Sequence, residues 1–169
     1  MINTLLGCLP KRRWVYLAAA AVCAGLIGFA LYLQYYKFQE PCPLCMLQRV
    51  VIILMGILFF IAGVHNPGRY GARVYGWIIT LTGLVGAGIA ARHVWIQYLP
   101  PEQVPVCGPG LDYMLQTMPF GSAIMQVLHG SGECADKSWM FLGLTIPGWT
   151  FLFFLFLAVL ALLLPRKSS

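Results

Sequence analysis

Residues 40–49 read EPCPLCMLQR, and this stretch decides how the rest of the chain is interpreted. It places Cys42 and Cys45 in a Cys-x-x-Cys pair, between the end of one apolar run and the start of another. Because proline is tolerated in the first turn of a helix but not in its interior, Pro41 and Pro43 predict that a helix begins here. The unpaired N–H groups and the positive dipole end of that turn favour a thiolate. The stretch therefore predicts a redox centre whose disulfide opens and re-forms.

The composition is that of a membrane protein. Of the 169 residues, 60% are hydrophobic and only 9% are charged, whereas roughly a quarter of a soluble domain is charged. The net charge of +6 does not indicate nucleic acid, because the basic residues cluster at the ends of apolar runs, where topology signals lie.

Apolar runs predict the fold class, an all-α membrane protein. The runs are long enough to cross a bilayer core of roughly 30 Å as helices, and the period-2 alternation of a barrel is absent. We expect a single membrane domain, a four-transmembrane-helix bundle with a long second periplasmic loop. The transmembrane spans are expected at about 14–35, 46–64, 73–95 and 147–164, with periplasmic loops at about 36–45 and 96–146.

Charged residues predict the orientation of the bundle. With four spans, both termini share one side, which carries seven basic residues and no acidic one: Lys11, Arg12, Arg13, Arg69, Arg73, Arg166 and Lys167. The opposite loops carry all five acidic residues: Glu40, Glu102, Asp112, Glu133 and Asp136. The positive-inside rule then puts both termini in the cytoplasm and the cysteines at 42, 45, 107 and 134 on the outer face.

Cys107 and Cys134 lie in the long outer loop. In an oxidising compartment they are natural disulfide partners, either in a redox relay or as a plain stabilising bridge. A Cys42–Cys45 bridge closes too short a loop to stabilise much, which favours reactivity for that pair. Zinc binding by these four cysteines is not favoured, because Cys107 and Cys134 are far apart in sequence, and no metal is predicted.

The other parts of the outer loop and the remaining cysteines carry no sign of a reactive group. The apolar-biased segments 111–118 and 123–128 either form small helices on the bilayer surface or pack on the helix ends. Gly130-Ser-Gly-Glu-Cys134 is expected to be a flexible approach to a mobile thiol. Cys8 and Cys23 are expected to be unreactive apolar thiols.

Arg49 lies four residues after Cys45, so both are expected on about the same helix face. It could snorkel to the surface, but charges within the membrane are costly and usually functional. Beside the pair, its cation would stabilise a thiolate or a reduced, anionic electron acceptor. His93, next to Arg92 near the outer end of the third predicted span, either donates to the same acceptor or anchors at the interface. No flavin or haem signature is present, and a membrane quinone fits this location.

With these features the chain resembles the DsbB disulfide bond formation proteins of bacterial inner membranes, over nearly its whole length. The resemblance rests on Pro-Cys-Pro-Leu-Cys-x-x-x-Arg at 41–49, on the cysteines at 107 and 134, and on Trp139-x-Phe-Leu-Gly-Leu-x-x-Pro147-x-Trp149. It implies a thiol:quinone oxidoreductase that reoxidises DsbA, a soluble periplasmic thiol oxidase. The implied cofactor is ubiquinone or menaquinone, and the implied partners are a DsbA-like oxidase and membrane lipid.

The resemblance also implies a role for each cysteine. DsbA would attack the Cys107–Cys134 disulfide at Cys107, and the released Cys134 would exchange with the Cys42–Cys45 disulfide at Cys42. Cys45 would then donate to the quinone, with Arg49 holding and polarising it. His93 is a weaker candidate for a quinone contact.

Two other functions fit the same pattern. A small membrane scaffold would use both disulfides only as structural bridges. A quinone reductase of the vitamin K epoxide type also has four helices and a Cys-x-x-Cys pair, but there the pair nearest the quinone belongs on a later span than the second.

Overall fold

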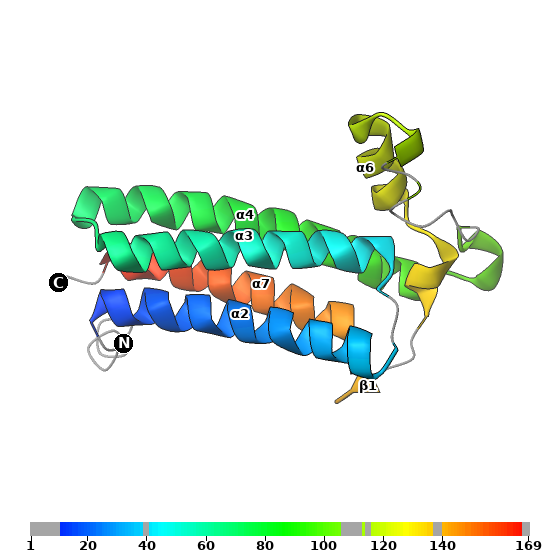
Figure 1. The fold of residues 1–169 in the computed structure, drawn as a ribbon, viewed down its shortest axis with the longest axis horizontal. Coiled ribbons are helices and arrows are strands. Elements are labelled where there is room, and N and C mark those ends of the chain that lie inside the picture. Colours follow the sequence, from blue (N-terminus) through cyan, green and yellow to red (C-terminus); the bar gives the residue numbers. More distant parts are fainter. Residues whose placement is uncertain (1–10, 39–40, 106–112, 114–115, 137–139, 167–169) are drawn as a thin grey trace.

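The protein is described by a computed structural model, which covers residues 11–38, 41–105, 113, 116–136 and 140–166. Four long helices run side by side: α2 (Arg12–Tyr36), α3 (Pro43–His65), α4 (Arg69–Gln97) and α7 (Ile146–Leu163) (Figure 1). All four are long and apolar enough to cross a membrane. The chain is therefore a multi-pass, all-α membrane protein, and the predicted fold class is confirmed.

The helices are neighbours in chain order, with α2 packed on α3, α3 on α4, and α4 on α7. The start of α2, the turn between α3 and α4, and the end of α7 lie at one end of the bundle (Figure 1). The opposite end carries the segment between α4 and α7. Its short elements are η1 (Pro101–Gln103), α6 (Phe120–His129), η2 (Gly132–Ala135), β1 (Met140–Phe141) and β2 (Leu144–Thr145), while η3 (Leu164–Arg166) follows α7.

Helix α3 ends in a tight turn toward α4. Its cap residue Asn66 has φ 43° and ψ 55°, a left-handed conformation that asparagine tolerates better than most side chains. Pro67 follows and cannot continue the helix. The guanidinium of Arg12, at the start of α2, donates to the Pro67 carbonyl oxygen. This contact ties the first helix to the turn and accounts for the burial of a basic residue at this end.

The interior of the bundle is one apolar cluster shared by all four long helices, with Tyr16, Met55, Phe59, Ile79 and Phe154 fully buried in it. Large apolar side chains on the outward faces remain exposed, for example Trp77, Leu81 and Phe156. In a bilayer those faces contact lipid, so their exposure carries no hydrophobic cost. Cys23 is 1% exposed within the cluster, in line with its interpretation as an apolar thiol.

Small residues let α4 and α7 approach closely. Gly76, Thr80, Gly83 and Ala87 recur at spacings of four, three and four along α4, and all are buried. The Thr80 hydroxyl lies 3.1 Å from the Ala158 carbonyl oxygen of α7 and 2.7 Å from the Gly76 carbonyl oxygen of its own helix. Small faces and shared polar contacts are the usual means of helix association in lipid, where the hydrophobic effect supplies no force between helices.

This close contact makes Gly76→Val strongly destabilising. A Cβ at Gly76 would lie 2.8 Å from the Ala161 carbonyl oxygen, which is backbone and cannot rotate away. We expect a loss of about 1–3 kcal/mol, the usual cost of overpacking. The matched control is Gly88→Val on the same helix, where an added Cβ meets nothing within 4 Å. Unfolding in mixed micelles should separate the two variants, and equal stabilities would contradict the packing described here.

Candidate active site

Cys42 is the cap residue at the start of α3, and Cys45 lies in the first turn. The Cys42 backbone is extended, with φ −63° and ψ 160°, and Pro43 takes the first helical position. The Cys42 sulfur accepts a hydrogen bond from the Cys45 backbone N–H at 3.4 Å. The Cys42 thiol thus takes the place of a capping side chain and faces the unpaired N–H groups of the first turn.

Both cysteines are free thiols in this structure, with their sulfur atoms 3.1 Å apart. A disulfide needs about 2.05 Å between sulfurs, so small side-chain rotations are enough to close the bond. Cys42 is 7% exposed, and Cys45 is partly exposed. The predicted pairing of Cys42 with Cys45 is therefore sterically accessible.

His93 of α4 lies against this pair. Its Nε2 atom is 3.6 Å from the Cys42 sulfur, its Nδ1 atom is 4.0 Å from the Cys45 sulfur, and the side chain is 2% exposed. Of the two interpretations that the sequence allowed, anchoring at the membrane interface does not fit a buried ring. The imidazole is placed to exchange a proton with either sulfur or with a molecule bound beside them.

Gln48 is a site residue that the sequence analysis did not single out. Its side-chain amide lies 3.1 Å from His93 Nδ1, and the residue is 4% exposed. Gln48 follows Cys45 by three positions, so it shares that face of α3. The available signal was a polar residue early in an apolar run, which in a membrane needs a partner.

Arg49 points toward α2. Its guanidinium donates to the Gln34 side-chain oxygen at 2.5 Å and to the Ala30 carbonyl oxygen at 3.3 Å. A cavity of about 600 Å³ between α2 and α3 begins one turn further along, and its lining includes Ile53 and Ile27. Arg49 follows Cys45 by four residues on α3, so the two lie on about the same face of the helix, while the end of the Arg49 side chain reaches oxygens of α2. The cation lies between the dithiol end of α3 and an apolar groove.

Cys134 lies in η2 and is 1% exposed, packed in a cluster with Cys42, Leu44, Ile96 and Val127. The segment that was expected to be a flexible approach ends in a short helical turn, in which the Cys134 backbone N–H bonds the Ser131 carbonyl oxygen at 2.9 Å. Ala123 and Val127 of α6 are buried in the same region, so segment 123–128 packs on the helix ends. Cys8, Cys107 and most of segment 111–118 lie outside the described residues.

A hydrogen bond from the Cys134 thiol to Cys42, together with burial, raises the pKa of Cys134 above its ordinary value. In the reduced protein we therefore expect Cys134 to be alkylated slowly at mildly alkaline pH, with the rise in rate displaced to higher pH. Removing the hydrogen bond in Cys42→Ala should lower the pKa and speed alkylation. Peptide mass spectrometry after timed labelling gives the rates, and Cys23→Ala is the control, expected to leave the profile unchanged. A wild-type profile in Cys42→Ala would contradict the contact.

The end of α4 holds the Cys134 segment in place. The Gln97 amide donates to the Asp136 carbonyl oxygen at 3.0 Å and accepts from the Thr145 hydroxyl at 2.7 Å. Arg92 donates to the Leu128 and His129 carbonyl oxygens at 3.4 and 3.2 Å. Arg92 therefore secures the end of α6, and Gln97 joins the loop on both sides of residues 137–139.

We expect Gln97→Leu to loosen η2 and expose Cys134, because the Asp136 carbonyl oxygen and the buried Thr145 hydroxyl both lose their partner. Leaving a buried polar group without a partner costs about 1–3 kcal/mol. The readout is the rate at which a bulky maleimide labels Cys134 in the reduced protein, which should rise several-fold. Gln126→Leu, on the exposed face of α6, is the matched control. Identical labelling of both variants would show that Gln97 does not restrain the loop.

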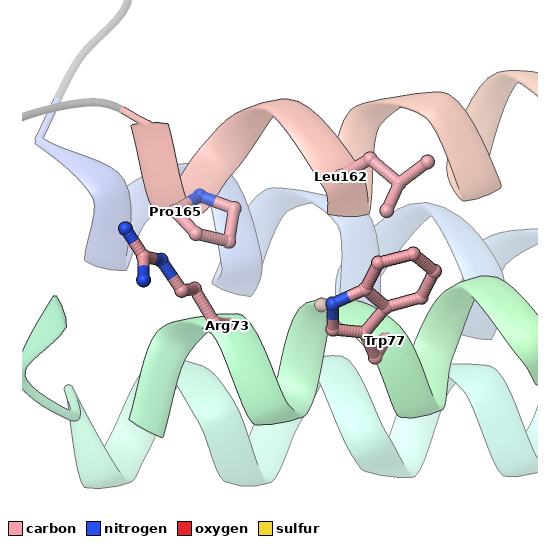
Figure 2. A pocket seen from close by; sticks show the side chains of 5 residues that line it. Arg73, Trp77, Leu162 and Pro165 are labelled. Carbon is pink, nitrogen blue, oxygen red and sulfur yellow. The ribbon is translucent and has the colours of Figure 1, made fainter. Parts of the chain in front are cut away.

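A second cavity, of about 400 Å³, lies between α4 and α7 near the opposite end of the bundle. Figure 2 shows Arg73, Trp77, Leu162 and Pro165 around it. Arg73 precedes His93 by twenty residues on the same helix, a distance of about 30 Å at 1.5 Å per residue. This cavity is therefore separate from the cysteine site.

The fold and the site together define a class: a small multi-pass membrane protein with a dithiol and an imidazole at one end of its helix bundle. The family model described as "Disulfide bond formation protein DsbB" matches residues 12–164. The chain belongs to this family. It is therefore a membrane-embedded oxidoreductase that acts in disulfide bond formation. The predicted family is confirmed.

Similar proteins cover almost the same length. "Disulfide bond formation protein B" of Hahella chejuensis is 49% identical over 157 residues, covering 92% of this chain and 95% of that protein. The protein of the same description from Nitrosococcus oceani is 48% identical, with 89% of each chain covered. That from Saccharophagus degradans is 50% identical, with 86% of this chain and 88% of the relative covered. The match to the family model, over residues 12–164, includes all four long helices.

Proposed function

We propose that this protein reoxidises a DsbA-like periplasmic thiol oxidase and passes the electrons through two cysteine pairs to a membrane quinone. The observation that carries the proposal is the contact of Cys42 with cysteines from both pairs. Its sulfur lies 3.1 Å from the Cys45 sulfur, and Cys134, from a segment far along the chain, packs against it and hydrogen-bonds it. Thiol–disulfide exchange needs such contact between the attacking and the attacked sulfur.

Electrons enter through the pair Cys107 and Cys134. A thiolate of the reduced oxidase attacks the Cys107–Cys134 disulfide at Cys107, forming a mixed disulfide and releasing Cys134 as a thiolate. The second thiol of the oxidase then attacks its own sulfur in the mixed disulfide, which releases Cys107 and leaves the oxidase oxidised. One disulfide is reduced for each disulfide made, and two electrons have moved to this chain.

The second exchange lies within the described site. The Cys134 thiolate attacks the Cys42–Cys45 disulfide at Cys42, and Cys45 leaves as the thiolate. Cys107 then displaces Cys42 and re-forms the loop disulfide. The restraints from Gln97 and Arg92 support this step, because they hold Cys134 at the sulfur that it must attack.

The electron acceptor is proposed to be ubiquinone or menaquinone, which takes up two electrons and two protons. Cys45 would face it, and His93 lies close enough to the dithiol to carry a proton between sulfur and acceptor. Arg49, with the apolar groove beyond it, would hold the polar head through its cation and leave the tail between α2 and α3. Membership in the family and this arrangement support the proposal.

The proposed location is the bacterial inner membrane, with both termini cytoplasmic and the redox cysteines periplasmic. The seven basic residues that the sequence puts on the side of the two termini, with no acidic residue among them, support this orientation. The spans are proposed at about 14–35, 46–64, 73–95 and 147–164, with the loops at about 36–45 and 96–146 in the periplasm. Cysteine labelling from each side of sealed vesicles tests it, and labelling of residues 42 and 45 from the cytoplasm would overturn it.

The decisive experiment supplies purified protein with a reduced DsbA-type oxidase and a soluble quinone. Quinone absorbance should fall, and oxidised partner should accumulate in equal amount. A structural scaffold predicts disulfides that resist mild reductant and no effect of quinone. A quinone reductase of the vitamin K epoxide type predicts that quinone reduction depends on a cysteine of a later span, which the position of Cys42 and Cys45 at the start of α3 disfavours.

A further inference from the structure

The reduced site has the composition of a metal centre. The ligand atoms of Cys42, Cys45 and His93 all lie within 4.8 Å of one another. Two sulfurs and one imidazole nitrogen are donors that zinc and cadmium prefer, whereas magnesium and calcium prefer oxygen. The sequence analysis considered zinc only for the four outer cysteines and did not include His93.

The distances fit a single tetrahedral ion. Zinc bonds of about 2.3 Å to sulfur and 2.0 Å to nitrogen place two sulfurs about 3.8 Å apart and a sulfur and a nitrogen about 3.5 Å apart. The Cys42 sulfur lies 3.6 Å from His93 Nε2, and the two sulfurs lie 3.1 Å apart. The sulfurs would have to separate by less than about 1 Å.

Gln48 completes the arrangement. A histidine that binds a metal through one ring nitrogen usually hydrogen-bonds through the other, which fixes the orientation of the ring. The Gln48 side-chain nitrogen lies 3.1 Å from His93 Nδ1. Rotating the amide by 180° exchanges its nitrogen and oxygen, and the oxygen then accepts the Nδ1–H. Nε2 is then left to the ion.

We propose that the reduced Cys42–Cys45 pair and His93 bind one thiophilic divalent cation, Zn²⁺ or Cd²⁺. The cation replaces the two thiol protons, which leave to solvent, and no electrons move. The protein supplies three ligands, so water takes the fourth position. Oxidation of the pair to its disulfide removes both sulfur ligands, so the ion and the disulfide exclude each other, and bound metal blocks the oxidation cycle. This proposal requires neither the partner oxidase nor quinone.

The test uses the full chain in detergent, reduced with a phosphine and then titrated with Cd²⁺ alone. Sulfur-to-cadmium charge-transfer absorption in the ultraviolet counts the bound ions, and competition with a chromophoric chelator measures the Zn²⁺ affinity. We expect His93→Ala and Cys45→Ser each to lose one bound ion relative to wild type. Cys23→Ser, which removes a buried thiol elsewhere, should keep it.

Two further measurements distinguish the loss of a metal ligand from misfolding of these variants. Wild-type protein with the Cys42–Cys45 disulfide closed should lack the ion without any substitution. Gln48→Leu keeps all three ligands and should weaken binding by about 10–100-fold, the usual cost of losing a partner behind a ligand. The proposal is overturned if reduced wild type binds no ion, or if His93→Ala and Cys45→Ser bind as many ions as wild type with equal affinity.

Discussion

Cys45→Ser is expected to abolish quinone reduction by the purified protein. Cys45 is the partly exposed member of the pair, lies in the first turn of α3, and has Cys42 and His93 as neighbours. A hydroxyl cannot form or break the disulfide, so Cys42 is left with no sulfur to close on. We expect the rate to fall by roughly three orders of magnitude or more, the scale seen when a covalent nucleophile is removed. The measurement is the initial rate of loss of quinone absorbance with reduced oxidase in excess.

Cys23→Ser is the matched control for this substitution. Cys23 is also buried, but it lies in the apolar core and in the lining of the groove between α2 and α3 rather than at the dithiol site. It takes part in no exchange step, so with soluble quinone at a saturating concentration its replacement should leave the rate within about twofold. Substitution at 42, 107 or 134 should stop the cycle as well. Full turnover by a Cys107→Ser protein would refute the relay of two cysteine pairs.

His93→Ala is expected to slow quinone reduction by about 10²–10⁴-fold, the usual contribution of a group that transfers a proton. Its ring is buried against both sulfurs, and within the described residues no other imidazole contacts them. Exchange between the reduced oxidase and the Cys107–Cys134 pair should continue, since it does not use this group. Reduced Cys42 and Cys45 should therefore accumulate in this variant during the reaction, as seen in samples quenched with acid.

His65→Ala is the matched control for His93→Ala. His65 is exposed at the opposite end of the bundle, where its Nδ1 lies 3.2 Å from the Tyr75 hydroxyl. Its loss should not change the rate. If His93→Ala kept the wild-type rate with its pH dependence unchanged, the imidazole would have only a packing role.

Much of the site could be predicted from local sequence. The start of α3 follows from Pro43 and from the capping position of Cys42, because proline sets the first helical residue and a cap must lie just before it. The four spans follow from length and hydropathy, since lipid demands helices with satisfied backbones. These are properties of short stretches of chain, and no partner from elsewhere alters them.

The neighbours of the dithiol could not be predicted in this way. His93 and Gln48 come from different helices, and their contact depends on how α3 and α4 are rotated about their axes. The sequence places Arg49 on the face of Cys45, but only the packing of α2 on α3 provides the Gln34 and Ala30 oxygens that bind its guanidinium. Cys134 was expected in a flexible stretch, but packing against Leu44 and Ile96 buries it. The conformation of a long side chain such as that of Arg49 depends on hydrogen-bond partners that come close to it only when the chain folds.

The sequence by itself determined the class of protein, the number of spans and the position of the reactive pair. Hydropathy and the signals for a helix start depend on stretches of roughly ten to twenty-five residues, so they predict the same spans however the helices pack against one another. Only the tertiary structure decided that an imidazole, an amide and a third thiol converge on that pair. The reason is that helix rotation is set by interdigitation of small residues such as Gly76 and Gly83 with α7, a condition that no single stretch of sequence contains.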